Sequence, residues 1–284
     1  EGMEAVRSAK LKREFRVVKG RYVKVIVGER GNMLLALCLA PIIALLVSFV
    51  LSGHRGEVTI GTETFRKVVT QQGQMAFVMT LVMIFLGIFG AIREIVKELP
   101  VYRHERFINL EILPYLASKA LPLAILGFVQ VLELLIVLHL FTDMRPPLVF
   151  WGQLFLLVPV IVAAMLLGLA ISAAVDTADK AVMLMILVII PQLLFANAFI
   201  RLEGFFGKLI AKVFILAYWA YDGLTALLPD SIVQAQRRDP NFFLLDWFMV
   251  VLFAAAYAGP AYFFMRRKDG PYGLSPIHII RCRR

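Results

Sequence analysis

Six apolar stretches alternate with charged segments along the chain. A helix needs about 20 mostly apolar residues to cross the hydrocarbon core of a bilayer, and none of the six contains Lys or Arg. Because they lack the two-residue alternation of a barrel, helices are the only spanning structure that satisfies their backbone. We predict an all-α integral membrane protein whose spans cover 33–52, 74–92, 120–141, 149–175, 181–200 and 245–265.

Residues 205–228 are a weaker candidate for a seventh span. Their apolar run is interrupted by Lys208, Lys212 and Asp222, which favours an outer re-entrant helical segment over a full crossing. Pro159 lies inside the long fourth span and predicts a kink or a tilt there.

The charge distribution supports six spans. The chain has a net charge of +10, and 21 of its 30 Lys and Arg residues lie in 1–32, 93–119, 176–180 and 266–284. The positive-inside rule places these segments, and both termini, in the cytosol. We therefore expect a cytosolic amphipathic connecting helix (1–32), a six-helix transmembrane domain (33–265) and a basic cytosolic tail (266–284).

Composition narrows the function. Apolar residues make up 60% of the chain, against about 45–50% in soluble domains, which excludes a water-soluble enzyme. No phosphate-binding loop, zinc-protease or serine-hydrolase motif occurs, and the four histidines are scattered. We expect no catalytic site, metal or cofactor in this chain and no nucleic-acid partner. Because residue 1 is Glu, a further domain is expected upstream.

The first segment has a helical stripe of apolar residues among basic ones. Leu11, Phe15, Val18, Tyr22 and Val25 form the stripe, as in an amphipathic helix that lies along the inner membrane surface. The alternative is a solvated basic tail attracted to anionic lipid.

Residues 93–119 are the most informative segment, because acids and bases interleave there between two spans. Pro100 is expected to break the helix that continues from the second span, and HERFIN (104–109) to form a short second helix. The segment is either a solvated loop with i,i+4 ion pairs or a docking surface for a cytosolic partner.

This segment resembles the intracellular coupling loop of ABC exporters with the G-subfamily (type V) fold, especially bacterial transporters that carry forkhead-associated domains. The matching residues are Glu94, Glu98, Tyr102, Arg103, Glu105, Arg106, Asn109, Leu110, Tyr115, Leu116, Ser118 and Lys119. Segments 17–35, 171–197 and 218–224 are also similar to the family. Departures include Asn197 where glycine is usual and Tyr218 where arginine is usual.

The resemblance implies a permease that works as a homodimer with two nucleotide-binding domains, fused or separate, which bind ATP and Mg. Eight residues would couple the permease to those domains: Glu94, Glu98, Tyr102, Arg103, Glu105, Arg106, Asn109 and Tyr115. A substrate cavity for a lipid, glycolipid or drug-like molecule would be lined by Phe77, Thr80, Phe85, Met185, Ile189, Gln192 and Asn197. Helices within 205–228 would form an outer gate. The alternatives for the cavity residues are plain packing and interhelical hydrogen bonds.

Glu133 is an acid deep in the third span, one helical turn from Gln130. Intramembrane carboxylates are costly and often functional, so the two form a candidate polar relay; the alternative is a hydrogen-bonded acid facing the bundle. Glu133 also supports a second hypothesis, an ATP-independent channel, scramblase or secondary transporter. A membrane scaffold or binding protein is a third.

Overall fold

The computed structural model describes residues 16–24, 28, 30–51, 63–107, 110–142, 147–198, 204–228 and 242–268. Within these ranges the chain forms helices joined by turns, without a β-strand, and residues 16–24 are helical. The helices are α2 (Arg30–Leu51), α3 (Glu63–Ala91), the 3-10 helix η1 (Val96–Glu98), α4 (Leu99–Phe107), α5 (Ile112–Phe141), α6 (Pro147–Ala174), α7 (Ala178–Leu194), α8 (Phe205–Phe214), α9 (Leu216–Ala226) and α11 (Phe243–Lys268).

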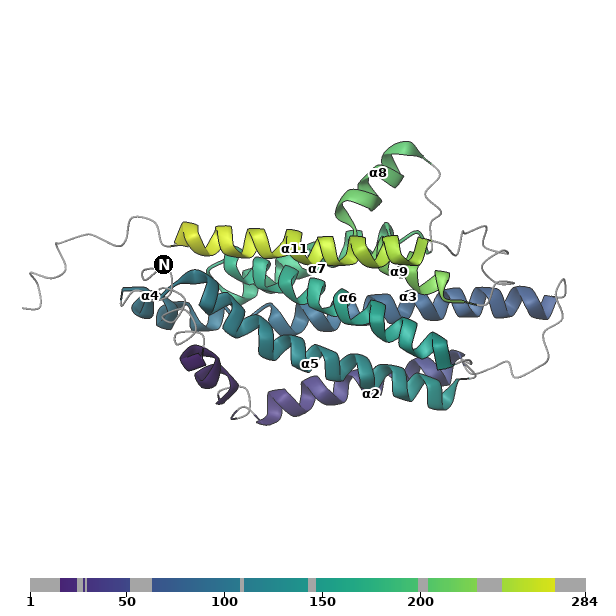
Figure 1. The fold of residues 1–284 in the computed structure, drawn as a ribbon, viewed down its shortest axis with the longest axis horizontal. Helices are drawn as coiled ribbons and strands as arrows, with labels where there is room; N and C mark the ends of the chain where they lie inside the picture. The colour runs from purple at the N-terminus through teal and green to yellow at the C-terminus, as the bar shows by residue number, and fades with distance from the viewer. Residues whose placement is uncertain are drawn as a thin grey trace, which may run out of the picture.

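The long helices run side by side along the longest axis of the molecule (Figure 1). Among the described residues, five helices are long and apolar enough to cross a membrane, and the pair α8 and α9, bent by 92°, would be a sixth if taken as one broken span. The prediction of an all-helical protein is therefore confirmed for the described residues, with about five to six apolar spans, and α7 is not among the five. The predicted span 181–200 corresponds to α7, which ends at Leu194 and has 17 residues.

Helix α6 is the centre of the bundle and contacts α3, α5, α7, α9 and α11. Its residues are on average more apolar than those of the other described helices, and the side chains of Leu156, Val160 and Ala164 are fully buried. In contrast, α2 packs mainly on α5 and α3 and leaves large apolar side chains such as Phe49 exposed. This exposure is typical of a helix that faces lipid tails rather than water.

Two glycines let α3 and α6 approach each other closely. A Cβ atom at Gly87 would lie 2.7 Å from the carbonyl oxygen of Ile161, and a Cβ atom at Gly168 would lie 2.7 Å from that of Ile88. Small residues at such crossings are the usual device for packing helices in membranes, where no hydrophobic force drives helices together.

After α3 the chain turns through residues 92–95, η1 and α4; we call residues 92–107 the elbow. The predicted helix break at Pro100 is wrong, because α3 already ends at Ala91 and Pro100 lies in the first turn of α4. Proline is tolerated in a first turn because the backbone N–H groups there have no partner within the helix.

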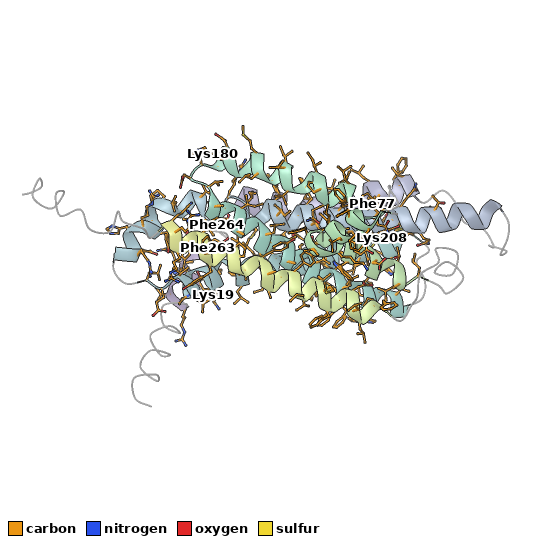
Figure 2. All side chains as sticks on the ribbon, turned by 90° about the horizontal axis from the view of Figure 1, so that it is seen from above. Lys19, Phe77, Lys180, Lys208, Phe263 and Phe264 are labelled. Atoms are coloured by element: carbon orange, nitrogen blue, oxygen red, sulfur yellow. The ribbon has the colours of Figure 1, made fainter. Side chains whose placement is uncertain are left out.

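The two ends of the bundle can be recognised in Figure 2. One end carries Lys19, Lys180, Phe263 and Phe264, and Phe77 and Lys208 lie toward the other.

Candidate functional site

Ser172 of α6 holds the start of the elbow. Its Oγ accepts hydrogen bonds from the backbone N–H groups of Ile95 and Val96, each at 3.1 Å. Ile95 is the N-cap of η1 and cannot cap the helix with its own side chain. A hydroxyl from a distant part of the chain therefore replaces the local cap.

Replacing Ser172 with Ala is expected to lower the free energy of unfolding by about 1–2 kcal/mol, because two buried N–H groups lose their acceptor. Thermal unfolding of the purified protein in detergent measures the effect. Ser172→Thr, which keeps the hydroxyl, should be less destabilising, and equal losses for the two variants would contradict the capping role.

A buried ion pair lies behind the elbow. Lys119, at the start of α5, has a fully buried side chain, and its Nζ lies 2.5 Å from a carboxylate oxygen of Glu98. The same Nζ lies 3.8 Å from the ring centroid of Tyr22, close enough for a cation–π contact. It also lies 5.8 Å from the ring centroid of Tyr115, so the charge of Lys119 is balanced by one carboxylate and two aromatic rings.

Tyr22 joins the helical segment 16–24 to this pair. Its hydroxyl donates a hydrogen bond of 2.5 Å to Glu94, which also forms an ion pair of 2.6 Å with Lys97. Burial, together with the negative charge of Glu94, raises the pKa of Tyr22, so the phenol stays protonated and remains a donor. Val18, one turn earlier, is also buried. The two described members of the predicted stripe thus pack against protein; Leu11, Phe15 and Val25 lie outside the described residues.

A second ion pair lies at the surface, where Arg21 contacts both carboxylate oxygens of Glu105. Within the elbow, Arg106 donates to the carbonyl oxygen of Leu110, and the rings of Tyr102 and Tyr115 are 4.7 Å apart. The structure therefore brings together Glu94, Glu98, Tyr102, Glu105, Arg106 and Tyr115 from the predicted coupling set, and leaves Arg103 exposed. Asn109 lies outside the described residues.

The predicted cavity residues separate into two groups. Phe77, Thr80, Met185 and Gln192 are buried within the chain, whereas Phe85 is exposed and Ile189 and Asn197 are half-buried. Phe85 stacks on the exposed Phe89 of the next turn, with ring centroids 5.7 Å apart. The accessible members thus lie on α3 and at the end of α7.

Gln192 of α7 is hydrogen bonded to both α9 and α11. Its side-chain oxygen accepts from the N–H of Ala217 at 2.9 Å, in the first turn of α9, and its side chain is also hydrogen bonded to Tyr257 of α11. Asn197 has φ 61°, in the left-handed region that glycine adopts most easily and that asparagine tolerates. The sequence departure at position 197 is therefore compatible with the local backbone.

The two residues of the candidate polar relay lie on α5. Gln130 donates to the carbonyl oxygen of Ala36 on α2, at 2.8 Å. Glu133 is half-buried, and its Oε2 has no hydrogen-bond partner among the described residues. Gln130 thus bonds the α2 backbone, and Glu133 keeps one unpaired oxygen.

Sequence reasoning missed several residues that organise the elbow. Arg21, Tyr22, Ser172 and Lys119 were absent from the candidate site, although Lys119 belongs to the resembling string. The sequence did contain one signal for a buried ion pair: Lys119 lies at the edge of a long apolar segment, four positions after Tyr115. Among the described residues, no group of three or more His, Cys, Asp or Glu side chains could hold a metal ion.

Two comparisons with known proteins bear on this site. The family model described as "ABC-2 type transporter" matches residues 13–228. Over 203 residues the chain is 25% identical to the ABC transporter ATP-binding/permease protein Rv1747 of Mycobacterium tuberculosis. That match covers 68% of this chain and 22% of the relative, so the chain spans under a quarter of that protein's length.

Proposed function

The chain belongs to the ABC-2 type transporter family, and we propose that it is the permease half of an ATP-driven exporter with a G-subfamily-like (type V) fold. Its family and its apolar helices make it a membrane-spanning component of an ABC transporter. ATP and Mg would bind on a nucleotide-binding domain, fused or separate, and not on this chain. The printed name of the relative, which joins ATP binding to a permease, supports such a partner.

The proposal depends on the elbow as the docking surface for the nucleotide-binding domain. The observation that carries it is the double attachment of segment 16–24 to the elbow, through Tyr22 to Glu94 and through Arg21 to Glu105. The elbow also packs on α5 through Glu98 with Lys119 and through Tyr102 with Tyr115, so a force on its outer surface would be passed to α5. Arg93, Arg103 and His104 are exposed and available to a partner.

Substrate would move between two copies of the chain. Met183, Leu187 and Phe89 are more than 45% exposed on α7 and α3, and these apolar faces suit a homodimer interface, an apolar cavity or lipid contact. Phe85, Ile189 and Asn197 would contact an amphipathic substrate, and the four buried residues would support them from behind. The bent pair α8 and α9 would form the re-entrant outer gate.

Orientation follows from charge. With the elbow and both termini in the cytosol, the basic segments face the cytosolic side of a bacterial inner membrane. Export from the cytosol or from the inner leaflet is then the direction of transport that the resemblance favours.

Charge reversal at the exposed pair tests the proposal. We expect Arg21→Glu and Glu105→Arg each to reduce the ATPase rate of the complete reconstituted transporter by about two- to fivefold, since an exposed pair contributes up to about 1 kcal/mol. The double swap Arg21→Glu with Glu105→Arg should restore the rate. Arg266→Glu, in the last turn of α11, is the control, because it reverses an exposed charge outside the elbow and outside the proposed gate.

Two outcomes would contradict the proposal in different ways. Unchanged ATPase activity in both single variants would exclude the elbow as the coupling surface. If the complete protein bound and hydrolysed no ATP but still moved substrate in a Glu133-dependent manner, the ATP-independent transporter would be the better hypothesis.

A further inference from the structure

A groove of about 660 Å³ opens on the side of the bundle away from the elbow. Its floor is α6, including Phe155, Val158 and Pro159, and its walls carry Phe128 of α5 and Trp247 of α11; Trp151 lines it near the start of α6. We call it the α5–α11 groove. None of its residues belongs to the elbow or to the predicted substrate cavity.

Pro159 leaves one backbone carbonyl oxygen in the floor of the groove without its helical hydrogen bond. Proline has no N–H, so the carbonyl oxygen of Phe155, four residues earlier, loses its partner within the helix. The indole N–H of Trp247 donates to that oxygen at 3.0 Å, and the Trp247 ring stacks on Phe155 with centroids 4.8 Å apart. The helical hydrogen bond that Pro159 cannot make thus leaves no unsatisfied carbonyl at this point, and the groove offers its occupant apolar contacts.

The position of the groove fits one leaflet of a bilayer. From Trp151 to Pro159 it follows α6 over eight residues, about 12 Å at 1.5 Å per residue, within the half-thickness of a core of about 30 Å. Trp151, 64% exposed, and Trp247 both lie one turn from the start of their helices. Tryptophan is enriched at the level of lipid headgroups.

We propose that the α5–α11 groove binds one acyl chain of a resident membrane phospholipid, whose headgroup lies beside Trp151. The apolar lining gives affinity for the chain, and Trp151 at one end of the groove fixes the direction in which the lipid lies. Because none of the described residues that line the groove is charged, we expect binding to be insensitive to headgroup charge. This lipid is a structural ligand, separate from any transported molecule.

Quenching of tryptophan fluorescence by brominated lipid tests the proposal. The probe is phosphatidylcholine with bromines on its acyl chain, titrated into the full chain in detergent micelles. Trp151 and Trp247 report on the groove, while Trp219, 8% exposed, adds a constant background. We expect saturable quenching with one lipid per chain, equal for brominated phosphatidylglycerol.

Filling the groove should abolish this binding site. Val158→Phe places a ring on the floor and should weaken the apparent lipid affinity at least tenfold, whereas Ile136→Phe, on the exposed side of α5 outside the groove, should not change it. If Val158→Phe fails to purify, Leu154→Phe fills the groove one turn away.

Three outcomes would overturn the proposal. Quenching that rises without saturation would show bulk lipid contact only. Equal affinity in the filled variant and the wild type would place the lipid elsewhere. A change in the monomer–dimer equilibrium on filling, without a change in lipid binding, would make a second copy the occupant.

Discussion

Glu98→Gln is expected to lower the free energy of unfolding by about 3–5 kcal/mol, because it leaves a buried charge without its partner. The Nζ of Lys119 lies 2.5 Å from Glu98 and its side chain is fully buried. The neutral amide of glutamine fits the space but cannot balance the charge, and the nearby ring of Tyr22 compensates only in part.

Removing both charges should be much less harmful. The double variant Glu98→Leu with Lys119→Met is expected to be close to the wild type in stability, because apolar replacements avoid the cost of desolvating two ions. Thermal unfolding in detergent, compared across the single and double variants, measures the coupling between the two residues. Additive losses would contradict the ion pair.

The same cycle separates stability from function. If the pair also fixes the elbow for its partner, the double variant should fold but lose part of its ATPase coupling. If the double variant kept both the stability and the ATPase coupling of the wild type, the ion pair would have only a packing role.

Gly87→Leu is expected to destabilise the bundle by about 3 kcal/mol or more, the upper end for overpacking. The added side chain would meet the carbonyl oxygen of Ile161 at 2.7 Å and the Cβ of Ala164 at 2.8 Å. Backbone and Cβ atoms cannot rotate away, so α3 and α6 must separate. The yield of folded protein and its unfolding temperature measure the loss.

Gly90 is the matched control, three residues later on the same helix. A Cβ atom there would meet nothing within 4 Å, so Gly90→Leu should be neutral or slightly stabilising, since glycine weakens helices. A similar loss for both variants would mean that helix propensity, and not close packing, decides the result.

Five of the six predicted spans correspond to helices that are long and apolar enough to cross a membrane, and they were predictable because their apolar residues form long runs. The interruption of 205–228 by Lys208 and Lys212 also pointed to the irregular segment that the structure divides at Ile215 between α8 and α9. Both signals come from residues that are close together in the sequence, so they can be recognised without knowing the fold.

The elbow was harder to predict because its geometry depends on distant residues. Helix α3 ends before Pro100. In the turn that follows, Ser172 of α6 accepts hydrogen bonds from the backbone N–H groups of Ile95 and Val96. Tyr22 looked like part of a membrane-facing stripe, but its hydroxyl bonds Glu94. A helical stripe shows that one face is apolar and does not show whether lipid or protein covers that face.

The contacts of Tyr22 also impose an order on biogenesis. Glu94 is 72 positions further along the chain, and Lys119 lies further still, beyond two predicted spans. At about 5–20 residues per second, a ribosome needs several seconds to make this interval. Segment 16–24 therefore stays undocked for several seconds after its own synthesis, and its docking on Glu94 and Lys119 follows the synthesis of the first two predicted spans.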